Sequence, residues 1–438
     1  MIEVLGIRFA RAARFEPPEL LPWDGTWLGD YGPACPQPPG EVFMTSGMPT
    51  DEDCLFLNVW SPDRDPDARR PVMVWIHGGG FRQGSGDHFL SRGPVLASKG
   101  DVVVVTLNYR LGALGFYGGT NCGLLDQRCA LQWVQQHIAS FGGDPSNVTL
   151  FGESAGSAAV GMHLRMPSSA GLFVRAAMQS GAGMGQPLER AERLAAELAE
   201  ELGADPRHVD ADSLVEAQLA LEAKRGGGMV FTPVETDEMG PPSDVPLIIG
   251  TNVDEVKLMG LRDPRRLDLD DAGLRKRLAK ELGDRFDDVV ERVAKARADR
   301  GEATTPAELY YAIRTERAFR APSLRFAEEH VEAGGPTYVY LFDWQSPLLD
   351  GWVGAAHVIE IPFVFGLAGS EALQMFTGAG PEADALSAAM MGAWTAFARG
   401  QEPWERYDLA RRATRLFGRE VRTVDDPRAE ERQVFSTR

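Results

Sequence analysis

The sequence predicts an α/β fold with a central, mostly parallel sheet flanked by helices. Short apolar segments rich in Val, Ile and aromatic residues alternate with helical patterns along the first part of the 438-residue chain. Residues 102–105 are apolar without alternation, which is typical of a strand covered on both faces. This alternation of strands and helices is typical of a doubly wound sheet, whose functional sites lie at the carboxyl ends of the strands.

The elements of this sheet can be assigned in chain order. Strands are expected at 55–60, 72–76, 102–107, 148–151, 245–250, 337–342 and 415–417. A helix is expected over 124–140, because Leu124, Leu131 and Val134 recur at helical spacing before two glycines end the pattern.

Two longer helical patterns, 187–225 and 267–335, lie between strand segments. The second contains Thr305-Pro306-Ala307-Glu308, which has an N-cap threonine, a first-turn proline and a capping-box glutamate. Because strand signals return after each pattern, the helices interrupt one sheet. We expect a single domain over 1–438 with helical insertions at 187–245 and 260–335.

Charge and composition exclude several partners. The formal net charge of −18 repels nucleic acid and anionic membrane surfaces. We find no secretory leader pattern, and no segment approaches the roughly 20 apolar residues that cross a bilayer. The four cysteines lack zinc-site spacing. We therefore expect a cytoplasmic protein, a monomer or small homo-oligomer, without metal, cofactor or membrane insertion.

A candidate nucleophile follows the strand at 148–151. Gly152-Glu153-Ser154-Ala155-Gly156 lies between this strand and a helical stretch over 158–164, the context of a nucleophile elbow. The glycines let strand and helix close tightly, and the turn lifts the serine hydroxyl out of the sheet. Alone, the pentapeptide is equally the entry of an ordinary helix.

A candidate oxyanion loop follows the strand at 72–76. In His77-Gly78-Gly79-Gly80-Phe81, three successive glycines free the backbone so that several N–H groups can point at one spot. A plain flexible turn and a phosphate-binding loop are the alternatives.

A general base is found by elimination. In this type of site the order along the chain is Ser, Asp or Glu, then His, and only His208, His330 and His357 follow Ser154. His208 precedes any strand end that could carry the acid. His330 lies in a polar helix and is expected at the surface, which leaves His357.

Two carboxylates compete as the acid of the site. The strand at 246–250 continues into Thr251-Asn252-Val253-Asp254-Glu255. Successive residues at a strand end point in different directions, so only one of them can orient an imidazole. The residues alone leave both Asp254 and Glu255 open.

Together these stretches resemble the type-B carboxylesterase family, which includes bacterial p-nitrobenzyl esterases and cholinesterases. The resemblance is carried by Glu52-Asp-Cys-Leu-Phe-Leu-Asn58, His77-Gly-Gly-Gly-Phe81, Asn108-Tyr-Arg-Leu-Gly112, Gly123-Leu-Leu-Asp-Gln127, Phe141-Gly-Gly-Asp-Pro145, Gly152-Glu-Ser-Ala-Gly156, Gln179-Ser-Gly181, Gly250-Thr-Asn-Val-Asp-Glu255 and His357-Val-Ile-Glu-Ile-Pro-Phe-Val-Phe365. It implies the α/β-hydrolase fold and a serine hydrolase that cleaves small carboxylic esters without a cofactor, through an acyl-enzyme. Amide or carbamate hydrolysis on the same residues is the alternative. A non-catalytic adhesion or scaffold relative is a remote one, because such relatives typically lose the serine.

The resemblance also implies roles for single residues. It implies a triad of Ser154, Glu255 and His357, with Asp254 as the runner-up acid. The implied oxyanion hole is formed by the N–H groups of Gly79, Gly80 and Ala155, and the implied supporting residues are Glu153, Glu360 and Ser180, the last as a hydrogen-bond partner. We add Phe81 and Phe363 as candidates for the walls of the substrate pocket.

Several positions depart from the family pattern. Val256 replaces the usual glycine after the acid, strands before Gly6 are largely missing, and the segment between Gly181 and Gly250 is short. Met44 stands where cholinesterases carry a choline-binding tryptophan, which counts against a quaternary ammonium substrate. Cys35 and Cys54 match a disulfide of secreted relatives, although reduced thiols are at least as consistent with the missing leader. The remaining cysteines, Cys122 and Cys129, are expected to be small buried residues.

Overall fold

A computed structural model describes residues 1–39, 49–182, 185–263 and 267–436. Met44 therefore lies outside the described residues. The chain divides into two compact units, residues 1–247 with 391–402 and residues 248–390 with 403–438. Among the helices described, none combines the length and the apolarity needed to cross a bilayer.

The first unit is built on six strands with the order β1-β4-β6-β5-β7-β8. Their bounds are β1 (Ile2–Arg8), β4 (Phe56–Ser61), β5 (Arg70–Ile76), β6 (Val103–Leu107), β7 (Gly143–Glu153) and β8 (Arg175–Gln179). β1 and β4 pair antiparallel and β4 and β6 pair antiparallel, whereas β6, β5, β7 and β8 run parallel to one another. β5 and β6 are almost continuously buried, as expected for a parallel sheet covered on both faces. A separate hairpin pairs β2 (Ala10–Arg11) with β3 (Glu19–Leu20).

The helices of the first unit are α1 (Pro94–Gly100), α2 (Gly112–Phe116), α3 (Cys122–His137), α4 (Ala155–Arg165), α5 (Leu188–Leu202) and α6 (Ala211–Lys224). α4 packs against β5, β7 and β8, and α5 packs against α6. α4 is buried along nearly its whole length, and its small residues allow close packing on the sheet. Trp75 and Phe151 meet edge to face in this core, with ring centroids 4.9 Å apart.

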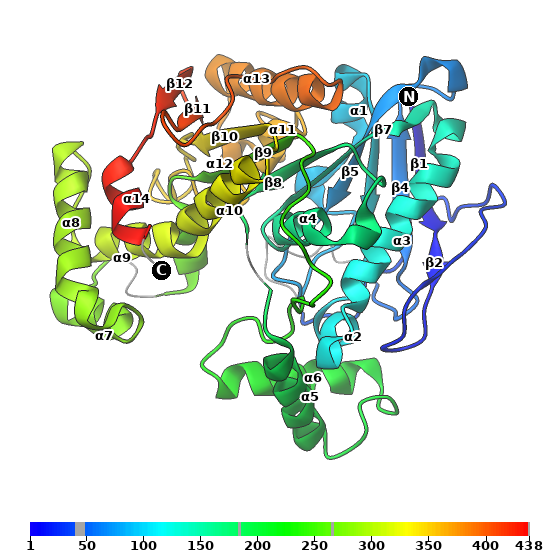
Figure 1. Ribbon diagram of the computed structural model, residues 1–438, viewed down its shortest axis with the longest axis horizontal. Coiled ribbons are helices and arrows are strands. Elements are labelled where there is room, and N and C mark those ends of the chain that lie inside the picture. The colour runs from blue at the N-terminus through cyan, green and yellow to red at the C-terminus, as the bar shows by residue number, and fades with distance from the viewer. Residues whose placement is uncertain (40–48, 183–184, 264–266, 437–438) are drawn as a thin grey trace. The chain divides into compact units, whose positions relative to one another are not determined.

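The second unit contains the strand order β9-β10-β11-β12. The strands are β9 (Leu247–Asn252), β10 (Thr337–Phe342), β11 (Ala413–Phe417) and β12 (Val421–Asp425). β10 and β11 run parallel, and β11 and β12 form an antiparallel edge. The helices are α7 (Asp271–Leu282), α8 (Phe286–Asp299), α9 (Pro306–Thr315), α10 (Ala321–Glu332), α11 (Ile361–Val364), α12 (Gln374–Thr377) and α14 (Ala429–Phe435) (Figure 1). The residues of α13 (Pro381–Ala398) are divided between the two units.

The predicted strands are confirmed, with shifts of a few residues at their ends. β7 begins at Gly143, ahead of the apolar run from which the strand was predicted. Thr305 caps α9 as predicted, because its side chain accepts a hydrogen bond from the Glu308 N–H at 3.3 Å. Strands β1 and β12 were not predicted, because both are partly exposed edges without a continuous apolar run.

The expected surface position of His330 is wrong. This residue is fully buried, and its Nδ1 lies 2.7 Å from the Thr337 hydroxyl. Thr337 opens β10, and α10 packs against that strand, so the residue faces the interior although its sequence neighbours are charged. A buried imidazole with a hydroxyl partner is a structural group here.

A buried ion pair in the first unit joins three segments that are distant in sequence. The Arg110 guanidinium donates to both carboxylate oxygens of Asp126 on α3, at 2.8 and 2.7 Å. Its remaining nitrogen donates to the carbonyl oxygens of Ala13 and Glu16 at 3.1 and 2.8 Å. Both charged side chains are almost inaccessible, so each depends on the other for its solvation.

We predict that Asp126→Asn lowers the free energy of unfolding by about 3 kcal/mol, because it leaves a buried guanidinium without its counter-ion. A guanidinium chloride titration followed by tryptophan fluorescence measures the shift, since Trp133 is buried on the same helix. The matched control is Glu19→Gln, which breaks the exposed Arg11–Glu19 pair and is expected to cost less than about 1 kcal/mol. Equal, small shifts in both variants would contradict the prediction.

Candidate active site

Ser154 occupies a sharp turn between β7 and α4. Its backbone angles are φ 55° and ψ −119°, a left-handed conformation that a side-chain-bearing residue adopts only when its surroundings impose it. The Ser154 N–H donates to the Gln179 carbonyl oxygen at the end of β8, at 2.8 Å. Within 151–160, Ser154 is the one residue that is not fully buried. The turn therefore presents the hydroxyl and buries its neighbours.

Glycines on both sides of Ser154 are required by close backbone approaches. A Cβ on Gly156 would lie 2.0 Å from the Ile76 carbonyl oxygen at the end of β5. A Cβ on Gly152 would lie 2.7 Å from the same oxygen, and one on Gly181 would lie 2.3 Å from the Ser154 carbonyl oxygen. No side chain fits at these three positions, which is the physical reason for the glycine spacing around the serine.

The glycine loop after β5 lies beside this turn. Gly79 and Gly80 have φ of 109° and 66°, and a Cβ on Gly79 would lie 1.9 Å from the Gln83 carbonyl oxygen. A Cβ on Gly78 would lie 3.1 Å from the Ser154 Cβ. Within the part of the chain that the structure describes, the N–H groups of Gly79, Gly80 and Ala155 donate no hydrogen bond. These are the features that an oxyanion hole needs.

Two residues that the sequence analysis missed border this loop. The Arg82 guanidinium donates to the Glu222 carboxylate on α6 at 2.9 Å, which anchors the loop from the side. Met229 is 42% exposed, and its sulfur lies 2.9 Å from the position of a Cβ on Gly80. The run Gly226-Gly227-Gly228 before Met229 was the available signal, because three open glycines in succession mark an adaptable loop.

In the second unit, the structure brings Glu255 and His357 together. The Glu255 carboxylate and His357 Nδ1 are 2.7 Å apart, and both side chains are almost completely buried. A carboxylate only accepts hydrogen bonds, so Nδ1 carries the proton and Nε2 keeps its lone pair. The second carboxylate oxygen of Glu255 accepts from the Asn252 N–H at 2.8 Å. The pair therefore has one orientation and one tautomer.

Glu360 lies beside this pair. Asn252 Nδ2 donates to the Glu360 carboxylate at 2.6 Å and to the Ala356 carbonyl oxygen at 2.7 Å. Burial, and then the negative charge of Glu255, raise the pKa of Glu360 to about 7. Glu360 was predicted from the sequence, whereas Asn252 was not. The Asn252 side chain connects Glu360 to the loop before His357.

A π-helical turn, Glu316–Arg320, supports the imidazole from another side. Its Phe319 ring lies 4.8 Å from the His357 ring, between centroids. Turns of this kind are rare and occur frequently at functional sites. Val256, which replaces the usual glycine after the acid, is buried, and its N–H donates to the Thr315 hydroxyl at 3.3 Å, just before this turn.

Some predicted site residues are buried within their own units. Phe81 and Phe363 are fully buried and pack edge to face on Phe116 and Phe342, and their role as pocket walls stays a prediction. The Ser180 hydroxyl is buried, and within the described part of its own unit it forms no hydrogen bond.

The other predicted residues of the first unit are buried. Glu153 lies directly under Gly78, where a Cβ would be 2.7 Å from its carboxylate. Cys35, Cys54, Cys122 and Cys129 are buried free thiols. A hydrogen bond with Cys35, with burial adding to it, raises the pKa of Cys54.

Comparison with known proteins identifies relatives along the whole chain. A family model described as "Carboxylesterase family" matches residues 3–415. The chain is 35% identical over 458 aligned residues to para-nitrobenzyl esterase of Bacillus subtilis, covering 95% of this chain and 90% of the relative. It is also 35% identical over 407 residues to phenmedipham hydrolase of Pseudarthrobacter oxydans, covering 85% and 80%.

Solved structures give the same result for the fold. A carboxylesterase of Geobacillus stearothermophilus superposes with a TM-score of 0.85 and 35% identity, over 99% of this chain and 96% of that chain. A thermophilic p-nitrobenzyl esterase superposes with a TM-score of 0.81 and 33% identity, over 99% and 95%. The predicted α/β-hydrolase fold is therefore confirmed, since these neighbours share it.

We predict that Glu360 makes stability fall as the pH rises toward neutrality. Its pKa is about 7 in the folded chain against a reference value of 4.5, so the folded state keeps this proton longer than the unfolded state. The stabilisation is complete below about pH 4.5 and is lost as the pH rises through about 7. The melting temperature of wild type is therefore expected to fall relative to that of Glu360→Gln between these pH values.

Scanning calorimetry at closely spaced pH values measures the difference. Glu382→Gln is the control, because it removes a carboxylate that is 65% exposed. Its melting temperature is expected to change with pH in the same way as that of wild type. If the melting temperatures of wild type and Glu360→Gln changed with pH in the same way, the prediction of a raised pKa for Glu360 would be contradicted.

Proposed function

The chain belongs to the carboxylesterase family and hydrolyses carboxylic esters, and we propose that Ser154, His357 and Glu255 are its catalytic triad. The observation that supports the proposal most directly is the buried contact of 2.7 Å between the Glu255 carboxylate and His357 Nδ1. An imidazole held in one tautomer beside a buried carboxylate is the arrangement of a general base in acyl transfer. A cytoplasmic location and a monomeric or small oligomeric state stay predictions.

Ser154 acts as the nucleophile in this proposal. Its Oγ attacks the ester carbonyl carbon while His357 Nε2 takes the hydroxyl proton. His357 then gives that proton to the departing alcohol, and an acyl-enzyme remains. Water, activated by the same nitrogen, hydrolyses the acyl-enzyme and releases the acid. Glu255 holds the imidazole in place and stabilises its charged form in both steps.

The N–H groups of Gly79, Gly80 and Ala155 stabilise the oxyanion in this proposal. Ala155 is the first residue of α4, so its N–H lies at the positive end of that helix. Loss of one such donor typically costs about 3 kcal/mol of transition-state stabilisation. Backbone donors also need no reorganisation when the charge develops, because the left-handed glycines and the helix start already fix them.

The substrate is a small-molecule ester, and we propose that it is uncharged or cationic. The chain carries a formal charge of −18, so an anionic ester meets a repulsive field before it reaches the site.

Carbamate hydrolysis is a second candidate activity. It is favoured by the 35% identity, over 85% of this chain, to phenmedipham hydrolase, whose name denotes action on a carbamate. A carbamate carbonyl differs from an ester carbonyl by one neighbouring nitrogen, so the same nucleophile, base and oxyanion donors would serve both.

We expect Ser154→Ala to lower kcat/KM for p-nitrophenyl butyrate by a factor of about 10³ or more, because no other group replaces the nucleophile. Stopped-flow or plate assays of p-nitrophenol release measure the change, and phenylmethylsulfonyl fluoride is expected to inactivate wild type. Ser98→Ala is the control, since this serine is exposed on α1. Activity of Ser154→Ala within tenfold of wild type would refute the assignment.

The two candidate activities can be compared with one leaving group. We expect turnover of a p-nitrophenyl ester to exceed that of a p-nitrophenyl carbamate, because the carbamate nitrogen donates electrons to the carbonyl. The carbamate is nevertheless expected to give a burst of one p-nitrophenol per active site. Absence of both burst and turnover would exclude the carbamate activity and leave the esterase.

A further inference from the structure

Asp254 precedes the proposed catalytic acid but does not contact the imidazole through its side chain. It follows β9 by two residues and lies just before a 3-10 helical segment, Glu255–Arg262. His357 Nδ1 donates its hydrogen bond to the Glu255 carboxylate instead. The side chain of Asp254 instead turns toward the segment that leads to His357, and it remains 14% exposed.

Three hydrogen bonds join this turn to the segment that carries His357. The Ala355 N–H donates to the Asp254 carboxylate at 3.1 Å, and the Asp254 N–H donates to the Ala355 carbonyl oxygen at 2.9 Å. The His357 N–H donates to the Glu255 carbonyl oxygen at 3.2 Å. These contacts fix the backbone of His357 against the backbone of Glu255, before any contact between their side chains.

Gly354 makes room for the first of these contacts. Its φ is 62°, and a Cβ at this position would lie 2.3 Å from the Asp254 carboxylate oxygen. Only glycine therefore allows the carboxylate to reach the Ala355 N–H. Asp254 and Gly354 form a matched pair, one supplying the acceptor and the other the space.

A chain of ion pairs holds the Asp254 carboxylate from its other side. Lys257 Nζ lies 3.1 Å from Asp254 and 3.1 Å from Glu308 on α9, and Lys257 is 11% exposed. Arg297 on α8 contacts Glu308 at 3.4 Å and Glu302 at 3.3 Å. Pairs buried to this degree are screened less by solvent than exposed ones.

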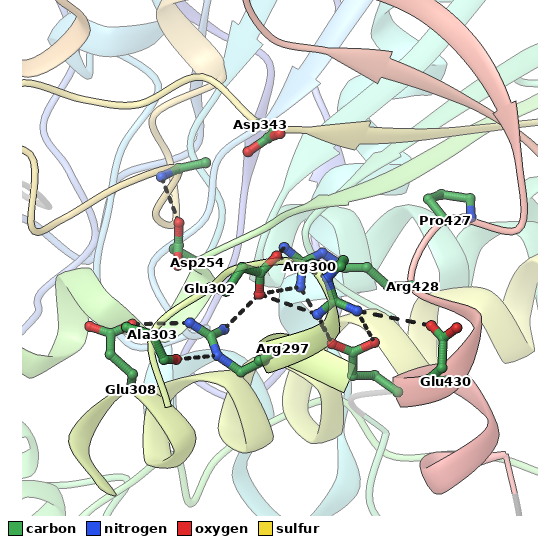
Figure 2. A network of polar contacts seen from close by, with 12 residues as sticks. Asp254, Arg297, Arg300, Glu302, Ala303, Glu308, Asp343, Pro427, Arg428 and Glu430 are labelled. Carbon is green, nitrogen blue, oxygen red and sulfur yellow. Dashed lines mark hydrogen bonds and ion pairs between the residues drawn. The ribbon is translucent and has the colours of Figure 1, made fainter. Parts of the chain in front are cut away.

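The network continues to the C-terminal helix. Figure 2 shows Arg297, Arg300 and Arg428 pointing toward the Glu302 carboxylate, and Asp254 pointing toward a backbone nitrogen. Arg300 and Arg428 also pair with Glu431 on α14. The carboxylate of Asp254 is thus one end of a charged network that includes residues of α8, α9 and α14.

We propose that Asp254 is a positioning residue, which clamps the 354–357 segment so that His357 Nδ1 stays within hydrogen-bond distance of Glu255. This inference rests on the proposed roles of Glu255 and His357. A displacement of about 1 Å in a reacting group can cost about a factor of 100 in rate, so a backbone clamp at this point matters for turnover.

The test compares Asp254→Ala with Asp254→Asn. Alanine removes the acceptor for Ala355, and we expect kcat for p-nitrophenyl butyrate to fall by about 30-fold with KM nearly unchanged. Asparagine retains a carbonyl oxygen for Ala355 while Lys257 keeps Glu308 as its partner, so its kcat is expected to recover to within about fivefold of wild type. Asp343→Ala is the matched control for loss of a nearby carboxylate. Asp343 is exposed, and among the described residues its carboxylate accepts a hydrogen bond only from Gln345, at 3.3 Å.

A spectroscopic readout separates positioning from stability. The proton between His357 Nδ1 and Glu255 is expected to give a strongly deshielded proton NMR resonance in water, assigned by its loss in His357→Ala. Asp254→Asn and Asp343→Ala are expected to keep this resonance, and Asp254→Ala to lose or shift it at an unchanged melting temperature.

Gly354→Ala provides a second route to the same contact, since its Cβ would push against the Asp254 carboxylate. We expect Gly354→Ala to lower kcat. The kcat of the double variant Asp254→Ala/Gly354→Ala is expected to lie no more than about threefold below that of Asp254→Ala, because both changes break the same hydrogen bond between Ala355 and Asp254. The proposal is overturned if Asp254→Ala keeps the wild-type resonance and kcat, or if the Asn and Ala variants lose activity equally. Those results differ from failure of the proposed triad, in which Ser154→Ala or His357→Ala would stay active.

Discussion

The start of α4 lies almost in contact with the end of β5, and the geometry of the first unit follows from this close approach. The Ile76 carbonyl oxygen leaves no room for a Cβ on Gly156 or Gly152. Once both positions are glycine, the chain between them must turn within one residue, and that residue, Ser154, takes a left-handed conformation. The same approach brings the glycine loop that follows β5 to the serine. The positions of the proposed nucleophile and of the proposed oxyanion donors therefore follow from one packing contact between backbone segments.

The second unit achieves its geometry by different means. Here the positions of Glu255 and His357 depend on side chains with charge or hydrogen-bonding groups, such as Asn252, Glu360 and Asp254. Burial makes each of these bonds strong, because water does not compete for the same donors and acceptors. It also makes each one costly to lose. The site geometry of the first unit depends on glycines, which have no side chain. That of the second unit depends on a complete set of charged and hydrogen-bonding side chains.

Much of this could be predicted from the sequence, for reasons that the structure makes clear. Strands such as β6 are buried on both faces, so their residues carry a continuous apolar signal. Glycine spacing predicted the serine turn, because steric exclusion acts over a few neighbouring residues. His330 was misplaced, because its burial depends on Thr337 in the next element and its own helix looks polar. The burial of Phe81 and Phe363 was likewise not predictable, since aromatic residues next to site motifs can equally serve the core. The choice between Asp254 and Glu255 needed the family resemblance, because two adjacent carboxylates are indistinguishable by pattern.

The Arg110 contacts have a consequence for how the chain folds during synthesis. The carbonyl groups of Ala13 and Glu16 find their donor nearly a hundred residues later, and that donor needs Asp126 to be buried at all. Residues 13–16 therefore cannot reach their final contacts until Arg110 and α3 are in place. This turn is therefore expected to become fixed late in folding, because its contacts join residues that are far apart in the sequence.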